Sequence, residues 1–215
     1  MTFEEFKQLA VSRRSIRDFS DDDIRLEDVR DIIDCARYAP SDTNSQTWEF
    51  IAVLNRDKIK AIEAFTWERL HEIAASSEER GLAREAKLMV KSFGPYATAF
   101  GSAPALIICL ATPYTSKFRE RIFDPLEFGS PEIWAEEGIK SSSLAIQNLM
   151  LAAHAKGLAT CPMTGPVLLA ESNLRHYLSI PEDRQINMAV ALGHPAVHPK
   201  SVARKEIDDI LTVIQ

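Results

Sequence analysis

A chain of 215 residues with 46% apolar and 26% charged side chains has the composition of a globular protein with a substantial core, which excludes an intrinsically disordered one. Its net charge of -6 argues against nucleic acid as the main partner, because a phosphate backbone requires a broad basic face. The sequence has no apolar run near the roughly 20 residues of a membrane span and no signal-peptide pattern at its start, so we expect a cytoplasmic protein that does not bind membranes.

The cysteines and histidines do not have the spacing of a metal centre. Cys35, Cys109 and Cys161 lie far apart without a CxxC pair, and such cysteine usage is typical of a reducing compartment. His194 and His198 are four residues apart, but the proline that follows each excludes a ligand pair on a helix. We therefore expect no metal, and we interpret Cys161 as a structural residue.

An arginine-rich segment follows the first predicted helix, which covers Phe3–Ala10. Within five residues this segment brings together three guanidinium groups and one hydroxyl, those of Arg13, Arg14, Ser15 and Arg17. Guanidinium groups match phosphate oxygens bidentately and a serine hydroxyl adds a compact donor, so the pattern favours anion binding. On its own the same pattern also fits a basic turn at the surface.

A polar loop rich in amides follows the second predicted helix, in which apolar residues recur with helical spacing over 29–36 until Pro40 ends it. The loop contains Asn44 and Gln46, whose amides both donate and accept hydrogen bonds and therefore suit the edge of a planar heteroaromatic ring. An ordinary helix stop followed by an Asn/Ser turn is the alternative. A strand is predicted directly after the loop, over Trp48–Leu54.

The middle of the chain contains helices, a buried strand and an irregular segment. Helices are predicted over Asn55–His71 and Ala83–Lys91, separated by a polar stretch at Ser76–Gly81. The continuous apolar run Pro104–Ala111 predicts a strand covered on both faces. Residues 114–129 show no period and are interpreted as an excursion or lid. Its aromatic residues, with one just beyond it, either line a substrate site or simply pack together: Phe118, Phe123, Phe128 and Trp134.

A long helix is predicted from Pro131 to about Lys156, with Gly157 ending it. Over Leu144–Ala155 it is apolar nearly all round, which indicates burial in a core or in a subunit interface. We interpret His154 in this stretch as a hydrogen-bonded core residue. The elements predicted after it are a short strand or turn over Leu158–Met163, a helix over Val167–Leu178, a strand over Gln185–Leu192, a short acidic helix after Arg204 and a last strand over Leu211–Ile214.

Helices and strands follow one another without strict βαβ alternation, so the predicted fold class is α+β. No linker, repeat or change of composition divides the chain, and we expect a single domain over residues 1–215.

The order of these segments resembles the nitroreductase family of flavin-dependent enzymes. The segments are RRSIRDF, then APSDTNSQTW and EFIAVL, the helix over 138–157, CPMTG, and LGHP followed by Arg204. They cover nearly the whole chain in the family's order. The resemblance implies a mixed, mainly antiparallel sheet flanked by helices, built as an intertwined homodimer with two molecules of flavin mononucleotide (FMN) at the interface.

The resemblance also implies roles for the two N-terminal motifs. Arg13 matches the position that contacts the FMN phosphate, with Arg14 and Ser15 beside it, and Arg17 matches a basic position at the pyrimidine edge of the flavin. The matching polar loop comes from the partner subunit and contacts the flavin ring and ribityl chain through Pro40, Ser41, Asn44 and Gln46. Thr47 stands where many members carry proline, which leaves these four residues in place.

Two further contacts are implied in the second half of the chain. A turn formed by Pro162, Met163, Thr164 and Gly165 matches a segment over the flavin face near N5; some members carry glutamate where Thr164 stands. Arg204 matches a basic position that completes the phosphate pocket, whereas Lys200 is offset from the usual spacing. A mid-chain polar or basic pair of the family has no clear counterpart around residues 96–100.

The function that the resemblance implies is transfer of hydride from NADH or NADPH, through FMN, to a small electron-poor aromatic such as a nitroaromatic or quinone, by a ping-pong mechanism. The flavin carries the chemistry, so no catalytic side chain is expected. The alternatives are an FMN-binding or sensing protein without turnover, a specialised reaction such as dehalogenation or flavin fragmentation, and a plain interaction protein that dimerises through its buried helix.

Overall fold

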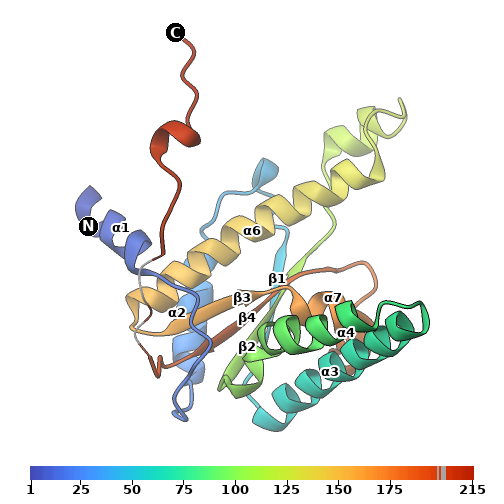
Figure 1. Ribbon diagram of the computed structural model, residues 1–215. Helices are drawn as coiled ribbons and strands as arrows, with labels where there is room; N and C mark the ends of the chain where they lie inside the picture. Colours follow the sequence, from blue (N-terminus) through green and yellow to red (C-terminus); the bar gives the residue numbers. More distant parts are fainter. Residues whose placement is uncertain (198, 200–201) are drawn as a thin grey trace.

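The computed structural model describes residues 1–197, 199 and 202–215, and a four-stranded sheet lies at its centre (Figure 1). The strand order is β1-β2-β4-β3, and each neighbouring pair is antiparallel. The strands are β1 (Trp48–Val53), β2 (Ala105–Ala111), β3 (Ala159–Met163) and β4 (Gln185–Gly193). The α+β class is therefore confirmed. The expected mixed sheet is corrected to an antiparallel one, with a single parallel bridge between Ser15 and Thr160 at its edge.

Helices cover both faces of this sheet (Figure 1). α2 and α6 pack on one face, and α3 and α7 on the other. The helices are α1 (Phe3–Ser12), α2 (Leu26–Ala36), α3 (Arg56–Glu79), α4 (Ala83–Leu88), α5 (Gly94–Ala97), α6 (Pro131–Ala155) and α7 (Gly165–Leu178). Short 3-10 turns cover Asp42–Asn44, Ala99–Ser102 and Ile207–Asp209, and π-helical turns cover Met89–Phe93 and Arg119–Phe123.

The apolar run of β2 is buried along its whole length, as its sequence predicts. Because side chains alternate along a strand, Leu106, Ile108 and Leu110 belong to the core on the α3 and α7 side. The residues between them belong to the core on the α2 and α6 side, where Ile107 and Cys109 lie. An antiparallel strand covered on both faces therefore needs no polar side, which explains its unbroken hydrophobicity.

The ends of α6 follow from local chemistry. The Ser130 hydroxyl accepts from the Ile133 amide, and Pro131 occupies the first turn, where no amide is needed. At the other end Gly157 has a φ of 76°, and the Leu158 amide donates to the Ala153 carbonyl at 2.9 Å. This left-handed stop is the reason that the chain reverses into β3.

Two helical predictions need correction. α3 continues to Glu79, through most of the polar stretch Ser76–Gly81, because the polar side chains of this stretch lie mainly on the solvent side of the helix. The chain then turns at Gly81, where φ is 80°. α6 is not buried all round: the side chain of Leu144 is 48% exposed. The core alternative therefore fails for this face of the helix.

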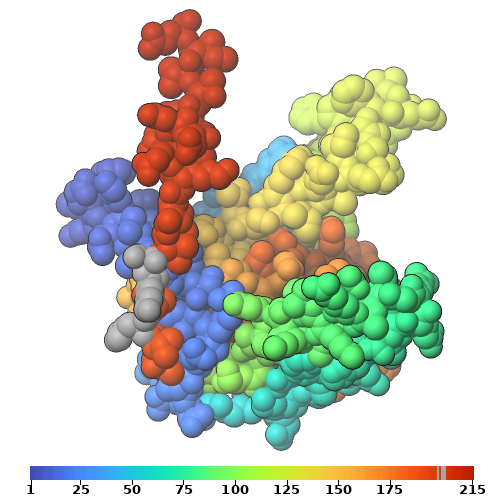
Figure 2. Space-filling model, viewed as in Figure 1, coloured from blue at the N-terminus to red at the C-terminus, as the bar shows by residue number. Residues whose placement is uncertain are grey.

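The last predicted strand, Leu211–Ile214, is also wrong for this chain. These residues form no strand, and the tail leaves the body (Figure 2). Its apolar side chains are largely exposed, Leu211 by 57% and Ile214 by 93%. An apolar extended run needs a sheet edge to pair with, and the tail projects away from the edges of its own sheet. The segment around 114–134 forms a second projection beside the first half of α6 (Figures 1 and 2).

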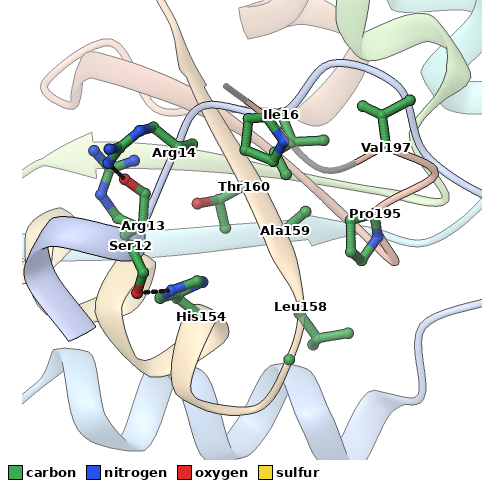
Figure 3. A pocket seen from close by; sticks show the side chains of 12 residues that line it. Ser12, Arg13, Arg14, Ile16, His154, Leu158, Ala159, Thr160, Pro195 and Val197 are labelled. Atoms are coloured by element: carbon green, nitrogen blue, oxygen red, sulfur yellow. Dashed lines mark hydrogen bonds between the residues drawn. The ribbon is translucent and has the colours of Figure 1, made fainter. Parts of the chain in front are cut away.

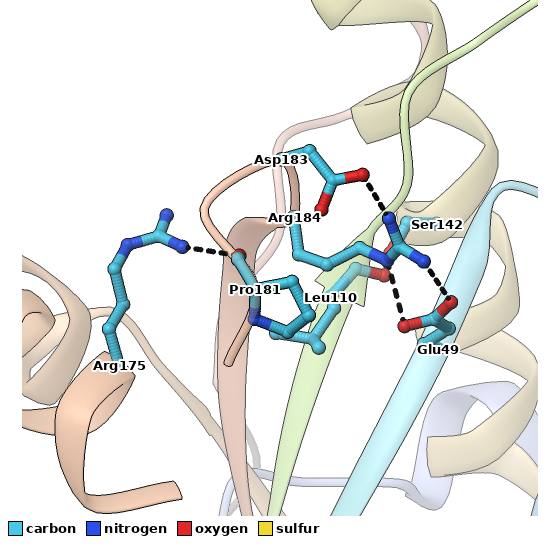
Figure 4. Close-up of polar contacts among 7 residues, drawn as sticks. All are labelled: Glu49, Leu110, Ser142, Arg175, Pro181, Asp183 and Arg184. Carbon is cyan, nitrogen blue, oxygen red and sulfur yellow. Dashed lines mark hydrogen bonds and ion pairs between the residues drawn. The ribbon is translucent and has the colours of Figure 1, made fainter. Parts of the chain in front are cut away.

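Polar contacts fasten the turn before β4 to its surroundings (Figure 4). Arg184 holds both carboxylate oxygens of Glu49 on β1, at 2.9 and 3.0 Å, and also contacts Asp183. From α7, Arg175 donates to the Pro181 carbonyl at 3.0 Å. The two arginines thus tie one turn to a strand and to a helix. Among the described residues no helix is long and apolar enough to cross a lipid bilayer.

Candidate cofactor site

The arginine-rich segment lies along the outer edge of the sheet (Figure 3). α1 ends at Arg13, and the chain then runs extended beside β3, where the Ile16 amide donates to the Thr160 carbonyl at 3.0 Å. Ile16 is buried and anchors the segment, whereas Arg13, Arg14 and Ser15 are half-buried. The edge strand therefore positions the three polar residues as a group.

The guanidinium groups of this segment are incompletely paired. Nη1 of Arg13 and Nε of Arg14 are buried and have no hydrogen-bond partner. Burial lowers the pKa of the Arg13 guanidinium, and the positive charges of Arg14 and Arg204 lower it further. Three like charges from the two ends of the chain therefore converge, and they do so where water is partly excluded. Buried charge without a partner is costly, so this cluster fits an anionic ligand.

A cavity of about 350 Å³ adjoins Arg13 and Arg14 (Figure 3). Its wall includes His154, whose Nε2 lies 2.8 Å from the Ser12 hydroxyl. Burial lowers the pKa of His154, with further contributions from the charges of Arg13 and Arg14. His154 is hydrogen-bonded as predicted, but it lies half-exposed at the cavity and not in the core, because the last turn of α6 passes beside the end of α1.

The end of β3 and the start of α7 lie close to the same cluster. The predicted turn 162–165 is corrected here, because Pro162 and Met163 are the last residues of β3 and Gly165 is the first of α7. Cys161 is buried, which raises the pKa of its thiol, while the charges of Arg17 and Arg13 act in the opposite direction. Of the residues that follow, Met163 and Gly165 are buried, Pro162 is half-buried and only Thr164 is exposed. The structure thus brings the arginine segment, Arg204 and residues 162–165 to one side of the sheet edge.

The polar loop has a strained backbone. Thr43, Asn44 and Gln46 have φ values of 49°, 56° and 49°, in the left-handed region that residues other than glycine seldom adopt. Each such residue costs about 1 kcal/mol or more, and strain of this kind concentrates at functional sites. The loop also buries the hydroxyls of Ser45 and Thr47 without partners, while the side chains of Asn44 and Gln46 remain exposed. Its remaining predicted contact residues are exposed Pro40 and half-buried Ser41.

The loop and the arginine cluster lie at opposite corners of one sheet. The loop leads into β1 and the cluster lies beyond β3. Two strands lie between β1 and β3, so at least about 14 Å separates the two motifs across the sheet. Trp48 pairs with Ala111, whereas Thr160 pairs with Leu192, which lies level with the start of β2. That offset of six residues adds about 20 Å along the strands, for a diagonal of at least about 24 Å. One chain therefore does not join the two motifs.

The aromatic residues of the predicted excursion or lid, 114–129, and Trp134 just beyond it pack mainly on one another. Tyr114 and Phe123 both stack near Trp134, with centroids 6.2 and 5.8 Å away, and the guanidinium of Arg119 lies 5.2 Å from the Trp134 ring. Phe123 also contacts Phe128 at 5.5 Å, whereas Phe118 is 66% exposed. The Tyr114 hydroxyl lies 3.5 Å from the hydroxyl of Thr43, so the base of the lid touches the polar loop.

Around residues 96–100 the sequence offers no clear counterpart of the family's mid-chain pair, and in the structure Tyr96 of this stretch lies beside Arg17. The Arg17 guanidinium lies 5.3 Å from the centroid of the Tyr96 ring. The nearby Ala97 packs against Gly165, where a Cβ would come within 2.6 Å of the Ala97 backbone. In the sequence Tyr96 follows Gly94 and Pro95, and no pattern in a single sequence links this tyrosine to an arginine 79 positions earlier.

Two of the predicted residues, Lys200 and His198, lie outside the described residues. Among those the structure does describe, no group of three or more His, Cys, Asp and Glu side chains is arranged to hold a metal ion.

The sequence and the fold are both similar to those of known proteins. The chain is 29% identical over 227 residues to the chloronitrobenzene nitroreductase of Comamonas testosteroni, covering 96% of this chain and 95% of the relative. Its fold matches a BluB-like flavoprotein from Clostridium difficile 630, with a TM-score of 0.80, 25% identity, and 98% and 99% of the two chains covered. It also matches a nitroreductase with bound FMN from Desulfitobacterium hafniense DCB-2, with a TM-score of 0.69, 24% identity and both chains covered completely at 100%. The model of the nitroreductase family matches residues 10–194, and the chain therefore belongs to the nitroreductase family.

Proposed function

We propose that this protein is an FMN-dependent oxidoreductase, a single domain over residues 1–215, that takes hydride from NADH or NADPH and reduces small electron-poor aromatics, nitroaromatics in the first place. The observation that carries the proposal is the buried, unpaired Nη1 of Arg13 beside the charges of Arg14 and Arg204. The nitroaromatic substrate class is supported by the chloronitrobenzene nitroreductase, which the chain matches over nearly its full length.

The donors at this corner of the sheet fit FMN. A phosphate monoester dianion would pair with the guanidinium groups of Arg13 and Arg204 and with the Ser15 hydroxyl, and charge-assisted bonds of this type are about twice as strong as neutral ones. Arg17 and residues 162–165 lie next to the cluster, where the ring system would follow its phosphate. A phosphate alone would leave this second group of residues without a role.

The amide loop would complete the site from a second copy of the chain. By strand spacing, Asn44 and Gln46 lie at least about 24 Å from the arginine cluster of their own chain, too far for one FMN to contact both. The exposed apolar residues of the tail and of α6, Ile214 and Leu144 among them, supply surface for such a homodimer. The strained loop would then be held in place by the flavin that it contacts.

Bound FMN would supply the electron transfer between nicotinamide and acceptor. The protein residues would bind and orient it. Arg17 would place a positive charge near the pyrimidine edge, which favours the electron-rich reduced form, and the backbone amides of residues 163–165 would border the ring. The lid around Trp134 would limit access of water and select flat acceptors by its stacked aromatic rings.

Absorption spectra of the purified protein, followed by anaerobic titration with NADH and with NADPH, test this function. We expect a flavin spectrum that bleaches with at least one nicotinamide and returns when 4-chloronitrobenzene is added. A flavin that neither nucleotide bleaches would favour the FMN-binding protein without turnover. A colourless protein whose melting temperature does not rise with FMN contradicts the proposal, because a ligand of the folded state must stabilise it.

A further inference from the structure

Arg17 is the residue of the arginine segment with the least protein support, and Tyr96 provides most of that support. Arg17 is exposed and takes part in no ion pair within the described part of the chain. Its guanidinium lies 5.3 Å from the Tyr96 ring centroid, which is cation–π distance. The Ser102 hydroxyl lies 3.5 Å from the Arg17 carbonyl and contacts the backbone as well. One segment, 94–102, thus contacts both the side chain and the main chain of Arg17.

The backbone that carries Tyr96 is held firmly, although 62% of the residue is exposed. It lies on α5, whose Gly94 fits against the Trp67 ring so closely that a Cβ would come within 2.5 Å. The Thr98 hydroxyl donates to the Gly94 carbonyl at 2.9 Å, and Ala97 packs against Gly165. The backbone beneath Tyr96 is therefore fixed from both sides, by α3 and by the start of α7.

Arg17 lines a second cavity, not the one that adjoins Arg13 and Arg14, and its charge reaches the candidate cofactor site at Cys161. That charge acts on the Cys161 thiol, directly before residues 162–165. The cavity of about 550 Å³ that Arg17 and Tyr96 line also contains Asp18, Lys60 and Glu63. Lys60 and Glu63 pair with each other at 2.8 Å, and within the described residues Asp18 forms no ion pair with Arg17. A long, flexible arginine with an aromatic ring under it and no carboxylate partner keeps its full charge for a ligand.

We propose that Tyr96 is a positioning residue, whose ring face holds the Arg17 guanidinium at the pyrimidine edge of bound FMN and so raises the affinity for the reduced flavin over the oxidised one. This inference rests on the proposed function. It adds to that function a residue from the middle of the chain, acting through Arg17, that determines the flavin's reduction potential.

The test compares Tyr96→Leu, which removes the ring, with Tyr96→Phe, which keeps it. Because an exposed cation–π contact contributes up to about 1 kcal/mol, we expect Tyr96→Leu to weaken binding of reduced FMN about fivefold more than binding of oxidised FMN. For a two-electron couple a tenfold ratio corresponds to about 30 mV, so the midpoint potential should fall by about 20 mV. Tyr96→Phe should restore the wild-type potential.

The matched control is Tyr177→Leu. This change also removes a ring beneath a cation, that of Lys58 at 4.8 Å, but at the far end of α7 from Gly165. We expect no change in potential. In an Arg17→Ala background, Tyr96→Leu should likewise have no further effect, because the two residues act as one unit. An equal loss in Tyr96→Phe, or an additive loss in the double variant, overturns the proposal.

A second readout is independent of flavin. Protons of the Arg17 side chain above the Tyr96 ring should show upfield NMR shifts that persist in Tyr96→Phe and disappear in Tyr96→Leu. Wild-type protein that binds no FMN but shows these shifts would contradict the proposed function and leave Arg17 held as described. Absence of the shifts, with or without flavin, overturns the positioning role itself.

Discussion

The arginine cluster and the polar loop meet the same requirement, a ligand, in opposite ways. Around Arg13 the backbone has ordinary dihedral angles and the energetic cost is electrostatic, since a buried guanidinium nitrogen has no hydrogen-bond partner. In the loop the side-chain amides are exposed to solvent and the energetic cost is conformational, because three residues other than glycine lie in the left-handed region. Each region is costly without a ligand, and each would be relieved by a different part of one: the phosphate and the ring.

The two regions differ in how much of their cost the sequence alone reveals. Charge clustering is visible in sequence because it depends on residue types alone, whereas strain depends on backbone geometry that Thr43 and Gln46 do not reveal. Both regions belong to one fold, yet they lie at opposite corners of its sheet. The comparison therefore predicts separate energetic responses to substitution, and a site that requires two chains.

The largest effect should come from removing the unpaired charge. Arg13→Ala should weaken FMN binding about 10- to 100-fold, because hydrogen bonds to charged groups contribute about 1.5–3 kcal/mol each. Arg13→Lys should recover only part of this, since an ammonium group does not reproduce the bidentate fork. Isothermal titration calorimetry measures both.

The surface change Arg80→Ala, at the end of α3, serves as the control for loss of one positive charge. Unchanged FMN affinity in Arg13→Ala would remove the phosphate role from the cluster.

The next effect concerns backbone strain. Thr43→Gly should leave the free energy of unfolding unchanged or raise it by up to about 1 kcal/mol, because glycine adopts a positive φ without a steric penalty. Gly157→Ala is the opposite change. It introduces backbone strain at a φ of 76°, where an added Cβ has no neighbour within 4 Å, and should lower the free energy of unfolding by about 1 kcal/mol. Urea denaturation without flavin measures both. If Thr43→Gly is as destabilising as Gly157→Ala, the loop is not strained.

A fully paired charge gives a reference for the unpaired one. Asp28 contacts Arg25 at 2.8 Å and Lys156 at 3.1 Å, and these hydrogen bonds lower its pKa from 3.8 to about 2. Because the folded-state pKa is depressed, the stabilisation is complete above pH 3.8 and is lost as the pH falls through about 2. Asp28→Asn should therefore cost about 0.5–1 kcal/mol at pH 7, allowing for solvent screening, without affecting FMN binding.

Equilibrium unfolding of Asp28→Asn and wild type checks this prediction, from about pH 2, the folded-state pKa, to about pH 7, well above the unfolded value of 3.8. A difference in unfolding free energy that stays constant down to the lowest pH would mean that the pair does not titrate as described.

The smallest effect is a change in titration. The charges of Arg13 and Arg14 help to lower the pKa of His154, so an anion that neutralises them should raise that pKa. Proton NMR titration with and without FMN measures the shift, and His154→Gln identifies the signal. A pKa that is the same in free and FMN-saturated protein would place the phosphate elsewhere.

Sequence patterns predicted the fold well where burial alone determines structure, as in β2 and α6. They failed where an element depends on something outside one chain or on distant contacts. Residues 211–214 have the composition of a strand but no sheet edge of their own chain to pair with. The apolar face of α6 at Leu144 is exposed in one chain, which leaves burial in a subunit interface as the remaining prediction. The arginine cluster was predicted from residue type, whereas the contact between Tyr96 and Arg17 could not be predicted because it exists only in the folded chain.

The central claim is that the arginine cluster of one chain and the amide loop of another form one site, and mixing two variants tests it most directly. Arg13→Ala and the double variant Asn44→Ala, Gln46→Ala should each bind FMN weakly as homodimers. If the site is shared, a heterodimer of the two contains one intact site and one site damaged twice. Titration of the purified heterodimer should then show one FMN per dimer bound with wild-type affinity. A heterodimer that recovers no tight site would show that each chain uses its own loop and cluster, and would contradict the account.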